Sequence, residues 1–238
     1  MMGGTPEIPE WIKSLRQPGY RNIFEYNEGG HSPFPDPSRP NLWGTETLAG
    51  DWNGNLLIVF KDFAETGFLH RRRDGRPMYS HAPNFATNRN LCALLSRSGR
   101  QLDLSGRGAS SCGILYASAS FLLRDSDARS GSVTNCLSTS WPVLEFTIAH
   151  MPRLTDIAVC GVDAFEAFCR MGGLAGNRRQ AQEARQPLQW RGLRVHCTSH
   201  TQPTAINTRA RDGQRGFDIA AADWAAILKT AFSAAPDT

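Results

Sequence analysis

Three polar side chains stand at the ends of apolar, β-branched runs of the sequence, where a folded sheet presents residues for chemistry. Asp62 follows the run at 55–60, Asn135 lies near the end of the run at 132–136, and His200 follows the run at 193–197. A carboxylate can orient water or stabilise positive charge, an amide donates and accepts at once, and an imidazole can donate to a developing anion. We therefore take Asp62, Asn135 and His200 as the candidate site.

The elements that position these residues alternate between strands and helices. Short apolar runs predict strands buried on both faces, and the segments between them have helical periodicity. The alternation predicts an α/β fold, a single three-layer αβα domain with a central, mostly parallel sheet of four to five strands. Ligands bind at the carboxyl ends of such strands, where the three candidates would meet. The expected strands are 55–60, 113–117, 132–136, 156–160 and 193–197, and the expected helices are 88–97, 142–150, 162–171 and 220–232.

The chain of 238 residues is long enough for one sizeable core. Residues 1–50 include prolines at 33, 35, 37 and 40, which prevent regular pairing, so we expect an irregular N-terminal arm packed on the domain at 51–238. The sequence contains no run of about 18 consecutive apolar residues, so we expect no membrane span. The first residues lack the blocks of a secretory signal, which favours a cytoplasmic location.

Several common classes of site have no support in the sequence. The six cysteines are scattered without a CxxC pair, so we expect no metal ion, iron–sulfur cluster or other cofactor. Phosphate-binding loops of the Walker or GxGxxG type are missing, as is the GxSxG nucleophile turn of hydrolases.

Arginine dominates the positive charge. Of 26 basic residues only three are lysines, and the net charge is +4. Two arginine clusters stand out, one at Arg71, Arg72 and Arg73 and one at Arg209, Arg211 and Arg215. The planar guanidinium suits phosphate oxygens, and two basic loops on one domain fit a phosphate-backbone ligand, although each alone is typical of a solvated loop.

In their order along the chain these segments resemble the uracil-DNA glycosylase superfamily, in a divergent bacterial-type branch without an iron–sulfur cluster. The resemblance spans about residues 54–232. It rests on Phe60-Lys61-Asp62-Phe63-Ala64 in the place of the loop with the water-positioning acid, and on Val133-Thr134-Asn135 as the strand end that reads uracil. It rests further on the strand–Gly–helix segment 157–164, on His200-Thr201-Gln202-Pro203 and on Arg215-Gly216-Phe217.

The resemblance implies roles for individual residues. Asp62 and His200 would be catalytic, and Asn135, Lys61, Phe63 and Ala64 would bind substrate. Tyr79 or Phe85 would stack on the flipped base, because Met78 occupies the usual aromatic position. Ala64 replaces a bulky tyrosine that excludes thymine in many members. The DNA-binding residues would be Arg71, Arg72, Arg73, Ser199, Arg209 and Arg215, together with Thr204 and Ile206 as candidate wedges that fill the vacated stack.

The resemblance implies a DNA repair glycosylase that flips uracil out of DNA and hydrolyses its N-glycosidic bond to leave an abasic site. We expect a monofunctional enzyme without a lyase step, because Lys61 should point away from Asp62 along the strand. The partner would be uracil-containing DNA, single- or double-stranded, and the protein a monomer associated with the nucleoid. Two alternatives remain: a glycosylase for hypoxanthine, xanthine or mismatched thymine, and a non-catalytic protein of this fold that binds damaged DNA.

Overall fold

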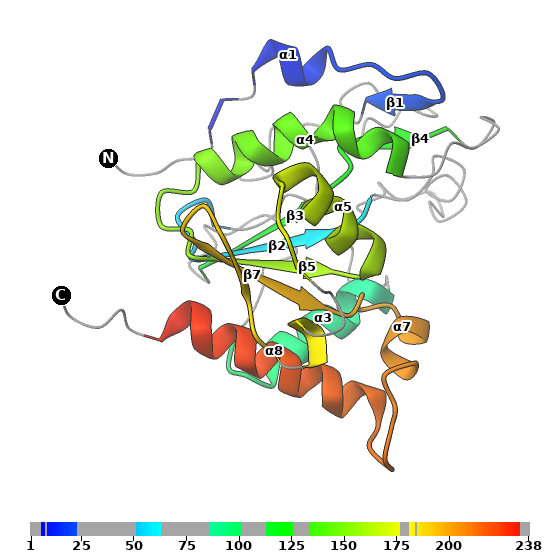
Figure 1. Ribbon diagram of the computed structural model, residues 1–238, viewed down its shortest axis with the longest axis vertical. Coiled ribbons are helices and arrows are strands. Elements are labelled where there is room, and N and C mark those ends of the chain that lie inside the picture. Colours follow the sequence, from blue (N-terminus) through cyan, green and yellow to red (C-terminus); the bar gives the residue numbers. More distant parts are fainter. Residues whose placement is uncertain are drawn as a thin grey trace.

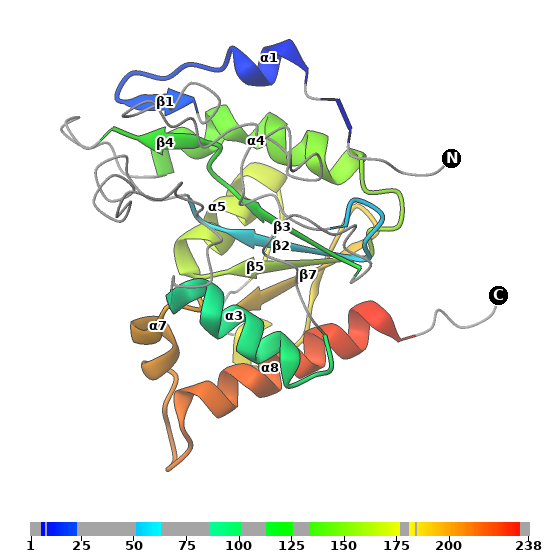
Figure 2. The same ribbon diagram turned by 180° about the vertical axis from the view of Figure 1, so that it is seen from behind.

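A computed structural model of the chain describes residues 6–7, 9–22, 51–62, 86–100, 113–125, 134–176, 181–183 and 185–233. Five strands form one sheet in the order β3-β2-β5-β7-β6, and only β6 runs antiparallel to its neighbour. Helices cover both faces of the sheet, α4 and α5 on one side and α3 and α8 on the other (Figures 1 and 2). The predicted three-layer αβα fold with a mostly parallel sheet is confirmed.

The elements follow the chain in an alternating order. The sheet strands are β2 (Leu56–Phe60), β3 (Ile114–Ser118), β5 (Asp156–Cys160), β6 (Leu188–Trp190) and β7 (Leu193–Thr198). The main helices are α3 (Ala86–Ser96), α4 (Thr134–Ala149), α5 (Val162–Gly172), α7 (Pro203–Asn207) and α8 (Gly216–Phe232). Near the N-terminus lie α1 (Glu10–Lys13) and β1 (Tyr20–Asn22), and β1 pairs with β4 (Leu122–Arg124).

Each face of the sheet has its own apolar core, because successive strand residues point to opposite faces. Leu57 and Val59 of β2 pack toward α4 and α5, where Phe165 lies. Ile58 of the same strand packs toward α3 and α8, where Trp224 is fully buried. Every residue of β2, β3 and β5 is buried, as continuous apolar strands in a parallel sheet require. This packing on both faces holds the strands in place and so positions the residues at the strand ends.

A buried ionic cluster joins the amino-terminal part of the sheet to α8. Asp156 is fully buried and accepts two hydrogen bonds from Arg194, at 2.9 and 2.7 Å, and one contact of 2.7 Å from His196. Arg194 also donates to the carbonyl oxygen of Thr230 in α8 over 3.1 Å. Burial by itself raises the pKa of Asp156, but the hydrogen bonds from Arg194, His196 and Thr155 outweigh it and hold that pKa at about 2.

The described part of the N-terminal arm is more regular than expected. It contains α1 and β1, and Ile12 is fully buried in the same apolar cluster as Leu144 of α4. The side-chain amide of Asn22 donates to the carbonyl oxygen of Ile12 over 2.8 Å, which ties β1 to α1. The proline-rich part at 33–40 lies outside the described residues.

The strand expected at 132–136 is wrong, because α4 begins at Thr134. Pro142, read from the sequence as a first helical residue, lies inside α4 instead. The carbonyl group that its missing N–H would bind belongs to Ser138, which is exposed, so water can satisfy it. The last helix also starts earlier than expected, at Gly216, where a Cβ atom would overlap the carbonyl oxygen of Ile206. In the part of the chain with described structure, no helix combines the length and apolar character needed to cross a membrane.

Candidate functional site

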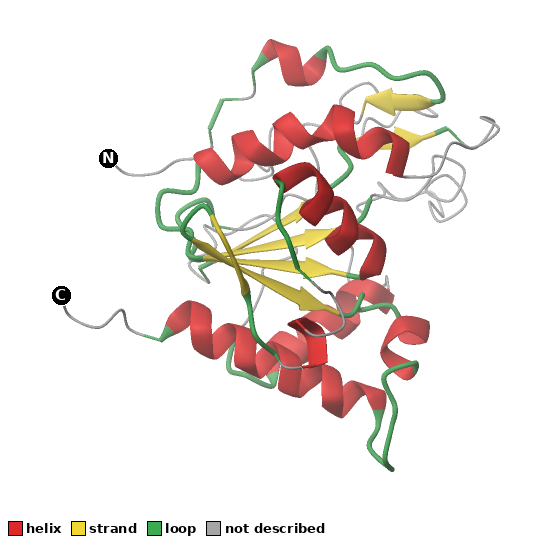
Figure 3. Cartoon of the chain, in the orientation of Figure 1, coloured by secondary structure: helices red, strands yellow, loops and turns green. Residues whose placement is uncertain are grey.

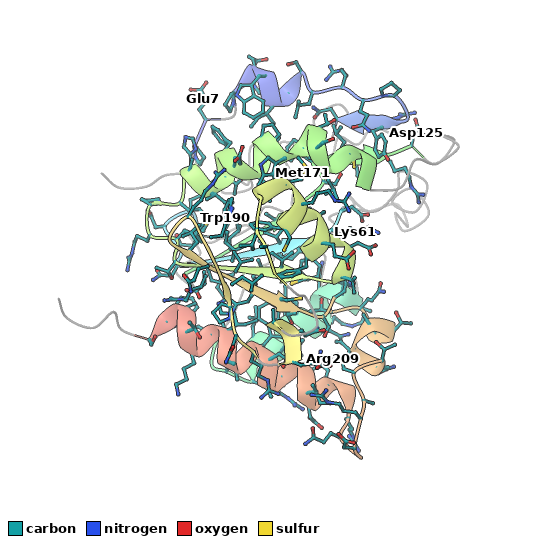
Figure 4. All side chains as sticks on the ribbon, in the orientation of Figure 1. Glu7, Lys61, Asp125, Met171, Trp190 and Arg209 are labelled. Atoms are coloured by element: carbon teal, nitrogen blue, oxygen red, sulfur yellow. The ribbon has the colours of Figure 1, made fainter. Side chains whose placement is uncertain are left out.

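The carboxyl ends of β2, β5 and β7 open into one cavity of about 470 Å³. The strands all end on the same side of the sheet (Figure 3), so residues far apart in sequence meet there. Five predicted site residues line this cavity, namely Lys61, Asp62, Ser199, His200 and Arg209. Figure 4 labels two of them, Lys61 near the strand ends and Arg209 below it, with Trp190 on the opposite side.

His200 is held in a defined orientation and a neutral state. Its ring stands at 89° to the ring of Phe60, with the centroids 4.9 Å apart. The main-chain N–H of Gln202 donates to Nδ1 over 3.1 Å, so the proton of the neutral ring is on Nε2. Burial and, secondly, the positive charge of Lys61 lower the pKa of His200 to about 4. At neutral pH the residue is therefore a hydrogen-bond donor without a charge.

Gly161 allows α5 to begin directly beside His200. Its φ of 100° and ψ of 157° fall in a region that only glycine adopts readily. A Cβ atom at this position would lie 3.4 Å from Cβ of His200. The N–H of Gly161 donates to the carbonyl oxygen of Thr198 over 2.8 Å, which ties the β5–α5 turn to the end of β7. The backbone conformation of Gly161 and this hydrogen bond thus place the start of α5 beside the histidine.

Lys61 lines the cavity together with Asp62. Strand β2 ends at Phe60, so the alternation of side chains along a strand no longer applies at Lys61. Its Nζ atom forms an ion pair with Oδ2 of Asp163, in the first turn of α5, at 2.6 Å. The ion pair bridges the ends of β2 and β5 across one wall of the cavity.

Asn135 belongs to the first turn of α4 and not to a strand end, which corrects its expected setting. Its neighbour Cys136 contacts Oγ of Ser120 at 2.8 Å, and the N–H of Ser120 donates to the carbonyl oxygen of Lys61 over 2.9 Å. The start of α4 is therefore close to Lys61, although the side chain of Asn135 is not among those described. The strand end beside β2 carries Ser118, paired in register with Phe60.

Arg209 connects the cavity to a buried carboxylate. Asp223 of α8 is almost completely buried and receives hydrogen bonds from Nη2 of Arg209 and, at 2.8 Å, from Nε of Arg185. Burial raises the pKa of Asp223 against the opposing effect of these arginines. Nε of Arg209 and Oγ1 of Thr198 are buried and have no hydrogen-bond partner among the described residues. Both residues line the cavity, and these two atoms lie behind its surface, shielded from solvent.

The wedge candidates separate clearly. Ile206 is wrong as a wedge, because it is only 2% exposed and packs with Trp224 in the core on the α8 side. It lies on the inner face of α7, where the Gly216 backbone approaches closely. Thr204 is exposed at the start of α7, and Arg215 is exposed before α8. Ser199, by contrast, is buried, and its Oγ lies 3.4 Å from the donor Nε2 of Gln182.

The remaining candidates Phe63, Ala64, Arg71, Arg72, Arg73, Tyr79 and Phe85 lie outside the described residues. Three contributors were not found from the sequence: Asp163, Gln182 and Asp223. Asp163 follows the recognised Gly161 by two positions, so the motif itself could have pointed to it. Nothing local marks Asp223, which looks like an ordinary surface acid in an alanine-rich helix.

Within the described ranges, no group of three or more His, Cys, Asp or Glu residues is arranged to hold a metal ion. No family model matches the chain, and no curated protein is significantly similar to it.

Proposed function

We propose that the protein is a DNA glycosylase that flips uracil out of DNA and hydrolyses its N-glycosidic bond, leaving an abasic site. One observation carries the proposal: a neutral, oriented His200 shares a strand-end cavity with Asp62. Departure of uracil develops negative charge on the base and positive charge on the sugar. A neutral donor and a carboxylate in one cavity match these two needs.

His200 supplies the donor for the leaving base. Because Gln202 occupies Nδ1, the Nε2–H group is the one that can donate to the uracil carbonyl oxygen as it becomes anionic. A preorganised donor of this kind contributes about 3 kcal/mol to transition-state stabilisation in other enzymes. Asp62 acts on the other side of the bond, where its carboxylate stabilises the oxocarbenium-like sugar and orients the attacking water.

The rest of the cavity suits the DNA backbone. Arg209 and Lys61 both line it and carry positive charge. Phosphate oxygens accept from guanidinium and ammonium groups, and most protein–DNA hydrogen bonds go to phosphates and sugars. Exposed Thr204 is the residue best placed by position to enter the space left by the flipped base.

A second candidate is a glycosylase for another damaged base, such as hypoxanthine or xanthine. It is favoured by the position of Asn135, which lies in the first turn of α4 and not at a strand end of the sheet, where the uracil-reading amide was expected.

Both candidate functions are tested with a panel of labelled oligonucleotides. Each oligonucleotide contains one uracil, one hypoxanthine, one xanthine or one thymine opposite guanine. EDTA is included and alkali is added after the reaction to cleave abasic sites. Preference for uracil supports the first function, and preference for another base supports the second. Binding of every oligonucleotide without release of any base contradicts both and leaves a damaged-DNA-binding protein.

A further inference from the structure

The turn that carries His200 is held on helix α3 by two side-chain hydrogen bonds. Nδ2 of Asn90 donates to the main-chain carbonyl oxygen of Thr201 over 2.8 Å, and Oγ1 of Thr201 donates to the carbonyl oxygen of Thr87 over 2.9 Å. Thr87 and Asn90 are three residues apart in α3, so they lie on one face of that helix. Because Thr201 is only 1% exposed, water has little access to compete for these bonds.

The bond from Asn90 and the bond to His200 meet in one peptide group. The carbonyl oxygen of Thr201 accepts from Asn90, and the N–H of Gln202 donates to Nδ1 of His200 over 3.1 Å. This carbonyl and this N–H belong to the same planar peptide group. The peptide bond is trans, so its C=O and N–H point in opposite directions. Asn90 therefore holds one side of the group whose other side holds the imidazole.

The direction of this peptide group decides which tautomer of His200 is favoured. With the Gln202 N–H aimed at Nδ1, that nitrogen must accept, and the ring proton is on Nε2. If the group rotates, Nδ1 loses its donor and becomes free to carry the proton. The ring would then present a lone pair at Nε2 in place of a donor. The bond from Asn90 opposes this rotation, and by polarising the peptide it also strengthens the N–H group as a donor.

The other contacts of His200 hold the ring without selecting a tautomer. Phe60 packs against it at 89°, and the Gly161 backbone lies close to its Cβ atom. Burial and, secondly, the charge of Lys61 lower the pKa of His200, which favours a neutral ring but not one neutral tautomer over the other. The choice of tautomer therefore depends on the peptide group of Gln202.

We propose that Asn90 is a positioning residue for His200, which acts through the Thr201–Gln202 peptide group to keep the ring proton on Nε2. Thr201 assists, because its hydroxyl group holds the same turn on α3. The consequence for catalysis rests on the proposed function, in which Nε2–H donates to the leaving base. Asn90 itself is not among the residues that line the cavity, so its loss should affect the chemical step and not the binding of DNA.

Correlation spectra of the histidine ring nitrogens and their carbon-bound protons measure the tautomer at neutral pH without any substrate. The chain has six histidines, and the His200 signal is the one missing from the spectrum of His200→Gln. We expect only the Nε2–H form in the wild type and a clear fraction of the Nδ1–H form in Asn90→Ala. Asn22→Ala is the matched control, because Asn22 also donates to a main-chain carbonyl oxygen over 2.8 Å, that of Ile12. It should leave the His200 signal unchanged.

Turnover on a single-uracil oligonucleotide gives the second readout. Asn90→Ala should lower kcat at least about tenfold while KM stays within about threefold, as expected when an interaction made only in the transition state is weakened. Thr201→Val keeps the side-chain shape but removes the hydroxyl group, so both its ring signal and its kcat should change in the same direction. Thr201→Ser keeps the hydroxyl group and should restore both. Thr147→Val is the matched control, because the buried hydroxyl group of Thr147 donates over 2.9 Å to the carbonyl oxygen of Val143 within α4.

The ring spectrum decides the proposal. A wild-type His200 signal in Asn90→Ala overturns it, whatever happens to turnover, and so does an equal change of the signal in Asn22→Ala. If Asn90→Ala does not fold, Thr201→Val and Thr201→Ser take its place, and identical His200 signals in these two variants overturn the proposal. The expected tautomer change in a protein that releases no uracil would instead count against the proposed function alone.

Discussion

The main-chain N–H of Gln202 donates a hydrogen bond of 3.1 Å to Nδ1 of His200, two residues earlier in the same turn. The bond places the proton of the neutral imidazole on Nε2, so the ring presents a donor to the cavity. Exposed Gln202 and Pro203 follow the histidine directly, so a short local turn performs the orientation.

The pKa of His200 makes a prediction about stability and pH. Burial, aided by Lys61, lowers this pKa from 6.5 to about 4. Between these values the unfolded chain takes up a proton that the folded chain refuses, so the contribution of His200 to stability is present above pH 6.5 and lost as the pH falls toward 4. Urea unfolding at several pH values should show that the free energy of unfolding falls less steeply with decreasing pH in His200→Gln than in the wild type. His150→Gln, at an exposed position after α4, is the control and should follow the wild type. Equal slopes for the wild type and His200→Gln would contradict the shifted pKa.

Gly161→Ala should impair base release more than it impairs folding. The substitution places a Cβ atom 3.4 Å from Cβ of His200 and forces a residue with a side chain to a φ of 100°. The matched control is Gly173→Ala at the other end of α5, where φ is 65° and nothing lies within 4 Å of the added atom. Both changes should cost about 1–2 kcal/mol of stability through backbone strain. We expect at least a tenfold lower turnover for Gly161→Ala alone, and similar turnover in the two variants would show that this approach to His200 is unimportant.

Arg209→Ala should weaken DNA binding in a salt-dependent manner. If Arg209 contacts one phosphate, its loss should reduce the slope of log affinity against log salt by about one. Arg191→Ala is the control, because Arg191 lies just before β7, at the end of that strand away from the cavity, and pairs with Glu145. Binding titrations with single-stranded DNA at several salt concentrations measure both. An unchanged slope in Arg209→Ala would mean that this arginine serves only to neutralise Asp223.

Arg194→Ala should destabilise the fold without touching the cavity. Asp156 would be left buried with only His196 and Thr155 as partners, and breaking such a pair costs about 3 kcal/mol. Arg191→Ala offers the comparison, because it removes only the exposed ion pair with Glu145, and it should cost less than about 1 kcal/mol of stability. Chemical denaturation of both variants checks the difference, and equal costs would contradict the importance of the buried cluster.

Sequence patterns predicted the strands well where burial is complete. The run at 55–60 and the run at 156–160 became β2 and β5 almost without shift, because continuous apolar strands are what a two-sided core selects. The errors arose where tertiary packing, and not the local sequence, determined the secondary structure or the burial of a residue. Val133 and Thr134 are β-branched, yet α4 begins at Thr134. Ile206 looked available, but the α8 core covers it.

The strand-end residues of the site could be predicted from the sequence, but the residues that pair with site residues could not. Asp62 and His200 follow the strands that hold them, so order along the chain was enough to bring them together. The pairing of Lys61 with Asp163 depends on where β2 stops and on the direction of α5, and neither is written in local sequence. The same holds for Asp223, whose burial results from the packing of α8 against residues distant in sequence.

The most direct test measures free uracil released from a single-stranded oligonucleotide labelled in its one uracil base, in the presence of EDTA. The wild type and Asp62→Asn are compared at equal DNA occupancy, checked by filter binding. The account predicts release of uracil by the wild type and a loss of at least about 100-fold in Asp62→Asn with binding retained. Uracil left in the DNA by a wild-type protein that binds it, or equal release by the two proteins, would contradict the assignment of this cavity as a glycosylase site.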